Sequence, residues 1–192
     1  MKKGILIAVI AVVAVAAIVC GVIFLGGDKA PKVEVADSAD VLNKVVSTYA
    51  EEEKFFAMGG DFENPVDNAP GIYSLADKEG AVATLHISED LIPQVSEAAS
   101  FIHAMNANTF TSVAFRLADP ATAETFSASL KDSITSTQWM CGFPEKLVMY
   151  TINGGEYVVY AVGAADLLDN FSAKLTTAYG EAAVETVNEA IA

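Results

Sequence analysis

The stretch "WMCGFPEK", residues 139–146, has the composition of a redox-active thiol site. A reactive cysteine needs a lowered thiol pKa, which a helix amino terminus directly after the cysteine usually supplies. Around Cys141 the order is reversed. A helical pattern ends near Ile134, before the cysteine, and a strand pattern begins near Lys146, after it. The spacing therefore lacks the positive helix end that would activate this thiol.

We expect the stretch to be a structural turn in which Trp139 and Phe143 pack under the edge of a sheet. Cys20, the only other cysteine, lies in a long apolar run and cannot serve as the resolving partner. An unpaired cysteine also argues against a disulfide scaffold. One alternative stays open: a thiol-dependent redox protein or enzyme that uses Cys141.

A second candidate is an oxygen-rich loop within "GGDFENPVDNAPG", because oxygen ligands in a flexible loop are what calcium takes. The side chains concerned are those of Asp61, Glu63, Asn64, Asp67 and Asn68. Their spacing does not match the D-x-[DN]-x-[DN]-G calcium loop, and a proline interrupts it. We expect a solvated loop without a metal.

Histidines and tyrosines complete the candidates. His86 and His103 lie in separate apolar runs with no cysteine or acid at ligand spacing, so we expect buried, hydrogen-bonded rings rather than a zinc site. Tyr150, Tyr157 and Tyr160 fall on two adjacent strands and could present a surface for a peptide or a glycan. We expect instead strand-forming tyrosines with their hydroxyls at the rim. No nucleophile elbow, P-loop or dinucleotide-binding glycine set is present. The sequence therefore predicts no catalytic, cofactor-binding or metal-ligating residue.

Residues 1–27 have the pattern of a membrane anchor. The run 4–27 carries no charge and follows Lys2 and Lys3. A bilayer core of about 30 Å needs about 20 apolar residues, which this run provides. Two lysines before it and acidic residues after it favour an amino terminus inside and the remaining chain outside. We expect an uncleaved single-pass anchor in the cell membrane.

Two processed forms are the alternatives to that anchor. A cleaved signal peptide would use a small-residue site such as residues 14–16, but cutting there would leave an apolar stretch exposed. A lipoprotein would use Cys20, but the preceding residues fit a lipobox poorly and the apolar run continues past the cysteine. We therefore expect Cys20 to be a small apolar side chain in the membrane helix.

Beyond the anchor the chain is strongly acidic. Residues 28–37 read as a short solvated linker, and residues 38–192 as a single domain. After residue 27 there are nine basic and 25 acidic residues, a net charge of −16. Such a surface repels phosphate backbones and anionic lipids, so nucleic acid is excluded as a partner. A protein or peptide partner in the cell envelope remains possible.

Apolar periodicity predicts the elements that position these residues. A helix begins at residue 38 with a cap from Asp37 or Ser38. The predicted order after residue 109 is a strand at 109–117, a helix from 119, strands at 146–152 and 156–162, and a helix from 165. Residues 153–155, Asn-Gly-Gly, suit a tight hairpin turn. We expect residues 58–71 to be irregular and residues 181–192 to add amphipathic helical turns with Val184, Val187 and Ile191 facing inward. The fold class is α+β: an antiparallel sheet packed against helices, with a β-α-β-β-α core after an N-terminal transmembrane helix.

The carboxy-terminal half resembles a known group of proteins. Its segments "SVAFRLADPATAETFSASLKDS", "FPEKLVMYTINGGEYVVYAVG" and "AADLLDNFSAKL" are similar to those of uncharacterised small envelope proteins of Firmicutes, and the Phe143-Pro144 turn is the most family-like element. In that family a membrane helix or lipoprotein signal precedes one domain of unknown function. The resemblance implies placement and fold, and it brings no site residues.

Two classes of function follow from these patterns. The first is a non-catalytic binding or accessory module of the cell envelope, which predicts an exposed apolar or tyrosine-rich patch. The second is the thiol-dependent protein that uses Cys141, which predicts an exposed cysteine beside a basic group or a helix start. The lack of a standard catalytic motif favours the first class.

Overall fold

The computed structural model describes residues 31–105, 109–139 and 142–191, and from Pro31 onward the chain forms one compact unit. No helix in these ranges is long and apolar enough to cross a membrane. The predicted anchor at residues 4–27 lies outside the described residues.

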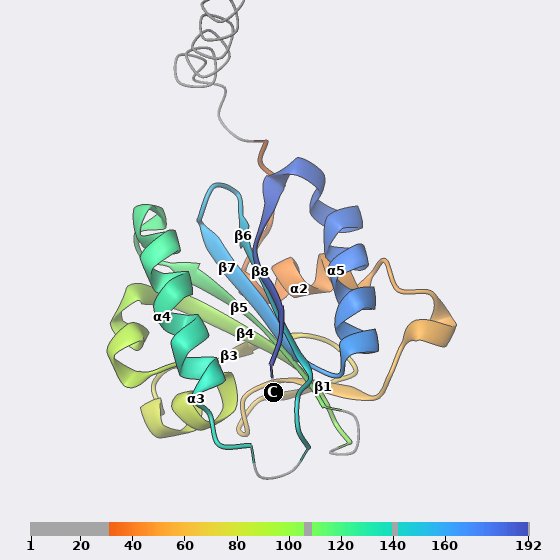
Figure 1. Ribbon diagram of the computed structural model, residues 1–192, viewed down its shortest axis with the longest axis horizontal. Helices are drawn as coiled ribbons and strands as arrows, with labels where there is room; N and C mark the ends of the chain where they lie inside the picture. Colours follow the sequence, from red (N-terminus) through yellow and green to blue (C-terminus); the bar gives the residue numbers. More distant parts are fainter. Residues whose placement is uncertain (1–30, 106–108, 140–141, 192) are drawn as a thin grey trace, which may run out of the picture. The chain divides into compact units, whose positions relative to one another are not determined.

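An eight-stranded antiparallel sheet forms the centre of the domain (Figure 1). The strands are β1 (Ala57–Gly60), β2 (Pro65–Asp67), β3 (Gly71–Tyr73), β4 (Val95–His103), β5 (Phe110–Leu117), β6 (Lys146–Ile152), β7 (Tyr157–Gly163) and β8 (Ala183–Ala190). Their order across the sheet is β2-β1-β4-β5-β7-β6-β8, and β3 pairs with β4 as well. The predicted α+β class with an antiparallel sheet is therefore confirmed.

Helices cover both faces of the sheet. The α-helices are α2 (Ser38–Val46), α3 (Lys78–Leu85), α4 (Ala123–Thr135) and α5 (Ala165–Tyr179), and short 3-10 turns span Glu51–Glu53, Glu89–Gln94, Pro120–Thr122 and Gly180–Ala182. Figure 1 shows α3 and α4 on one side of the sheet and α2 and α5 on the other. The chain order β5-α4-β6-β7-α5 is the predicted β-α-β-β-α core.

Local signals fix the ends of these elements as the sequence predicts. Asp37 caps α2 by accepting a hydrogen bond from the backbone N–H of Asp40 at 2.8 Å. Asp119 accepts one from the N–H of Ala121 at 3.0 Å, directly before Pro120 opens the next helical segment. In the β6–β7 turn Asn153 has a φ of 56°, a left-handed conformation that asparagine tolerates better than most residues.

Two apolar cores lie on opposite faces of the sheet. On one face Phe110 and Tyr157 pack with residues of α2 and α5, such as Val41 and Phe171. On the other face α3, α4 and the Glu89–Gln94 turn cover the sheet, and Phe126 of α4 packs there with the sheet residues. β7 between them is buried at every position, which explains why it reads as apolar on both faces.

The carboxy-terminal segment corrects one prediction. Residues 183–190 form strand β8, paired with β6, rather than helical turns. Alternation in a strand sends neighbouring side chains to opposite faces, so only some of the predicted inward residues are covered. Val187 and Ile191 pack partly against the core, while the side chain of Val184 is 59% exposed.

The glycine- and proline-rich stretch at residues 58–71 corrects a second prediction. Residues 58–71 were expected to be irregular, yet β1 and β2 form a hairpin, and β1 and β3 each pair with β4. The strands approach closely because Gly59 and Gly71 lack side chains. A Cβ at Gly59 would overlap the backbone of Ala69 and Gly71. Backbone pairing, rather than an apolar run, makes strands of this segment.

The first described residues contact the β6–β7 hairpin. The N–H of Val33 donates to the side chain of Asn153 at 2.9 Å, and the Asn153 amide donates back to the Val33 carbonyl at 2.9 Å. Lys32 forms an ion pair with Glu156 at 3.3 Å. The chain therefore contacts the domain ahead of residue 38, where the sequence places the end of the linker.

Candidate binding site

The helices leave one corner of the sheet uncovered. β1 and β4 pair so that Met58 lies opposite Ile102, and the same register places Thr111 of β5 next in the row. Thr111 is buried, whereas Met58 is 40% exposed. A row of side chains that is covered at the centre of the sheet thus becomes open at its β1 end.

This open end is a hollow of about 470 Å³. We call it the Met58 hollow; its boundary includes Met58, Phe62, Tyr73, Thr84 and Ile102. Met58 and Ile102 belong to strands of the sheet, and Thr84 belongs to α3, the shortest α-helix of the described residues. Its volume falls within the range of roughly 300–1,000 Å³ typical of ligand sites.

Asp61 holds the loop between β1 and β2 in place. One carboxylate oxygen accepts the backbone N–H groups of Glu63 at 3.0 Å and Asn64 at 2.8 Å, and the other accepts the N–H of Ser74 at 3.0 Å. These hydrogen bonds, that from Ser74 first, lower the pKa of Asp61. The carboxylate therefore stays ionised and fixes Phe62, whose side chain is 87% exposed at the rim of the hollow.

A smaller hollow of about 170 Å³ adjoins the first and shares Asp61, Phe62 and Tyr73 with it. We call it the acidic hollow, because Glu63 and Asp77 line it together with Asp61. The linings of the two hollows contain no lysine or arginine among the described residues. An apolar cavity is thus joined to one bounded by three carboxyl groups.

A third hollow lies on the opposite face, beside α2. It has a volume of about 480 Å³ and is bordered by Tyr49, Phe55, Phe56 and Phe101, with Lys54 at its edge. Phe55 packs against Phe101 with ring centroids 5.6 Å apart, and Lys54 forms an ion pair with Glu51. These aromatic contacts belong to the core on that face, so this hollow is an extension of that core at the surface of the domain.

The residues of the predicted oxygen-rich loop have different roles. Asp61 uses its oxygens for backbone N–H groups, and Asn68, with a φ of 56°, turns the chain after β2. Asp67 lies opposite Met58 in the β1–β2 register. Within the described residues no group of three or more histidine, cysteine, aspartate or glutamate side chains could hold a metal ion.

The two predicted histidines lie in separate aromatic contacts. The His86 ring lies 4.5 Å from the Trp139 ring, and burial lowers the pKa of His86 to about 4. The His103 ring stacks on Phe55 at 4.9 Å, and its Nδ1 accepts the N–H of Met105 at 3.0 Å. Burial lowers the pKa of His103 as well. Both rings are therefore neutral at pH 7.

The three tyrosines are strand residues as expected, but all of them are buried, so they offer no surface for a peptide or a glycan. The Tyr160 hydroxyl donates to the Leu85 carbonyl at 2.8 Å, and the Tyr150 hydroxyl donates to Glu185 at 2.7 Å. Tyr157 lies in the other core, where Arg116 sits over its ring at 5.8 Å. Their rings therefore pack in the two cores, and the hydroxyls of Tyr150 and Tyr160 form hydrogen bonds within the domain.

Cys141 lies outside the described residues, so its thiol chemistry stays a prediction. Of its predicted neighbours, Trp139 is partly buried against the core as expected. Phe143 is 78% exposed, which corrects the expectation that it packs under the sheet edge. The turn places Phe143 outward at the end of the sheet where β6 begins.

The residues of the Met58 hollow were missed by the sequence reasoning, because they come from a stretch that reads as a loop. The available signal was the placement of Met58 and Phe62 on either side of Gly59, Gly60 and Asp61. Comparison with known proteins adds no further guide to the site. No protein-family model matches the chain, and neither does any curated protein or solved structure.

Proposed function

We propose that this chain is a membrane-anchored binding module of the cell envelope with a non-catalytic role. In this proposal residues 4–27 hold the protein in the membrane, and the acidic α+β domain projects on the extracytoplasmic side. The two lysines before the uncharged run and the acidic residues after it support the placement.

One observation carries the binding role: the Met58 hollow is an open apolar surface beside a sheet whose central strand β7 is covered on both faces. Exposed apolar surfaces rimmed by polar residues mark interaction sites in soluble domains. Met58 and Phe62 border this hollow and are exposed, and the exposed side chains of Val66 and Ile72 belong to the adjoining strands β2 and β3. This concentration favours the β1–β3 corner as the contact surface.

Site-specific photo-crosslinking tests the binding role. A benzoylphenylalanine at position 62 of the full-length chain should form adducts in the membranes of cells that make the protein. Substituting Met58→Ser should remove these adducts, since it changes the floor of the hollow but not the rim. The same photo-reactive group at Val184, another exposed apolar position, on β8, is the control. Adducts that do not depend on Met58, or that form equally at position 184, would overturn the proposal.

Protease accessibility tests the placement. The full-length chain should sediment with membranes, and a carboxy-terminal tag should be cleaved by protease added outside intact spheroplasts. Recovery of the chain as a freely soluble protein, or protection of the tag until the membrane is opened, would contradict the proposed anchor and orientation.

A further inference from the structure

The carboxyl groups around the Met58 hollow restrict what it can bind. Asp61 belongs to the boundaries of both hollows, and Glu63 and Asp77 complete the acidic hollow. Asp67 lies directly opposite Met58 across the β1–β2 pair, on the same face of the sheet. Between Lys54 and Lys78 the chain has these four acids and no lysine or arginine. A bound group therefore meets negative charge on several sides of an apolar floor.

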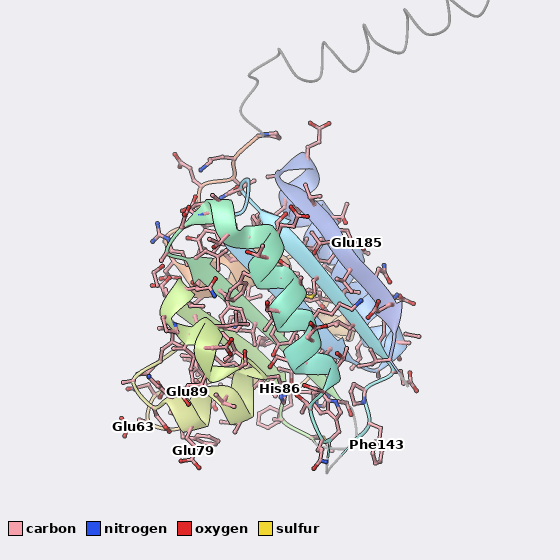
Figure 2. The ribbon with its side chains drawn as sticks, turned by 60° about the vertical axis from the view of Figure 1, so that its left-hand side comes forward. Glu63, Glu79, His86, Glu89, Phe143 and Glu185 are labelled. Carbon is pink, nitrogen blue, oxygen red and sulfur yellow. The ribbon has the colours of Figure 1, made fainter. Side chains whose placement is uncertain are left out.

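Further acids lie at the same corner of the domain as Glu63. Figure 2 shows Glu63, Glu79 and Glu89 at the corner beside α3, whereas Glu185 lies at the opposite edge, along β8. Lys78, the base nearest in sequence, forms an ion pair with Glu89 at 3.5 Å. Lys78 is therefore paired with Glu89, and no lysine or arginine of the described residues lines the acidic hollow to neutralise Glu63 or Asp77.

We propose that the Met58 hollow binds a protein segment carrying an apolar side chain next to a lysine or arginine. This inference rests on the proposed binding function of the same hollow. The apolar side chain fills the space above Met58 and Ile102, and the cationic side chain enters the acidic hollow between Glu63 and Asp77. Opposite charges across an interface raise the association rate and select the partner more than they raise the affinity. A nucleic acid or an anionic lipid surface does not fit, since the acids repel phosphate.

Three synthetic peptides with one apolar pattern test the charge. Their polar positions carry lysine, glutamine or glutamate, and the protein is the full-length chain in nanodiscs of zwitterionic lipid, with empty nanodiscs as reference. The lysine peptide should bind about tenfold more tightly than the glutamine peptide at low salt, and the advantage should shrink at high salt. The glutamate peptide should bind most weakly.

Matched variants locate the effect. Replacing the two exposed rim acids, Glu63→Gln with Asp67→Asn, should reduce the advantage of the lysine peptide about threefold, because exposed charge pairs contribute modestly. Asp61 is left intact because it holds the loop. The control pair Glu181→Gln with Val184→Ser removes an acid and an apolar side chain from exposed positions at the β8 edge and should change nothing. Met58→Ser should weaken the lysine and glutamine peptides alike.

Each contrary outcome has a distinct meaning. Equal binding of the lysine and glutamine peptides would overturn the cationic partner while leaving an apolar binding function intact. Absence of binding by all three peptides would also overturn it, and the crosslinking in native membranes would then decide the broader function separately. A benzoylphenylalanine at position 62 that labels nanodisc lipid instead of peptide would identify the corner as a lipid contact and overturn the protein partner.

Discussion

β7 and β2 represent two ways of building one sheet. All seven residues of β7 are buried, and apolar side chains from both cores press on its two faces. All three residues of β2 are exposed, and its corner is held by close backbone approach at Gly59 and Gly71 and by the hydrogen bonds of Asp61. Apolar burial therefore stabilises the centre of the sheet. At the β1–β3 corner, backbone contacts set the shape, and the apolar side chains there stay exposed and available to a partner.

The largest effect is expected from the centre. Phe126→Ala in α4 removes a fully buried ring that packs edge-on against Phe115 with centroids 5.7 Å apart. The free energy of unfolding should fall by about 3–5 kcal/mol, as measured by urea denaturation. Val184→Ala at an exposed position should change it by less than about 0.5 kcal/mol. A loss below about 1 kcal/mol for Phe126→Ala would show that the centre is not stabilised by burial on this face.

Gly59→Ala should disrupt the corner alone. The added Cβ overlaps the backbone of Ala69 and Gly71, which a side-chain rotation cannot relieve. We expect a loss of about 1–3 kcal/mol together with faster amide hydrogen exchange in β1 and β3, while β6 and β7 keep their protection. Exchange that rises equally in β6 and β7 would contradict the distinction between centre and corner, because the corner would then unfold only with the whole domain.

Tyr160→Phe tests how α3 is tied to the sheet. The Tyr160 hydroxyl donates to the Leu85 carbonyl in the core, so its removal leaves a buried acceptor without a partner. The free energy of unfolding should fall by about 1–2 kcal/mol. Tyr150→Phe is the matched control, since the hydroxyl there reaches the more accessible Glu185 and its loss should cost less. Equal losses for the two variants would refute the role of burial.

The acid response should show the burial of His86. Its pKa is lowered to about 4 in the folded protein, below the value of about 6.5 in an unfolded chain. The unfolded state therefore binds protons first, so stability is lost as the pH falls from about 6.5 to about 4. His86→Asn should reduce this loss, because asparagine does not titrate and tolerates the φ of 49° at this position. NMR titration of the imidazole checks the pKa, and a value near 6.5 would contradict the burial.

Met58→Ser should have the smallest effect on stability. The side chain is 40% exposed, so folding removes little of its apolar surface from water. The free energy of unfolding should therefore fall by less than about 1 kcal/mol. Thermal unfolding measures this change beside that of Phe126→Ala. A large loss would mean that Met58 belongs to the core and that the hollow is part of the packing, which would undercut the binding role.

Residues with strong local signals were predictable. The hairpin around Asn153 and the helix from residue 165 follow from turn chemistry and apolar periodicity, and both are confirmed. β8 was misassigned because Val184, Val187 and Ile191 have helical spacing among good helix formers. Pairing with β6 overrides that local preference, and no nearby residue announces it. The Met58 hollow could not be predicted for the same reason, because Met58 and Ile102 become neighbours only when β1 pairs with β4.

The contact between α2 and α5 has a consequence for how the protein is made. The Tyr179 hydroxyl donates to the Val41 carbonyl across 138 residues of sequence, and the two helices share one core. A chain synthesised from its amino terminus must therefore wait for α5 before that core can close, and folding dominated by such distant contacts is slow. Until then α2 can pack only against the sheet, where it contacts β4 and β5. Assembly of this face is therefore completed only once α5 is present, however early α2 forms.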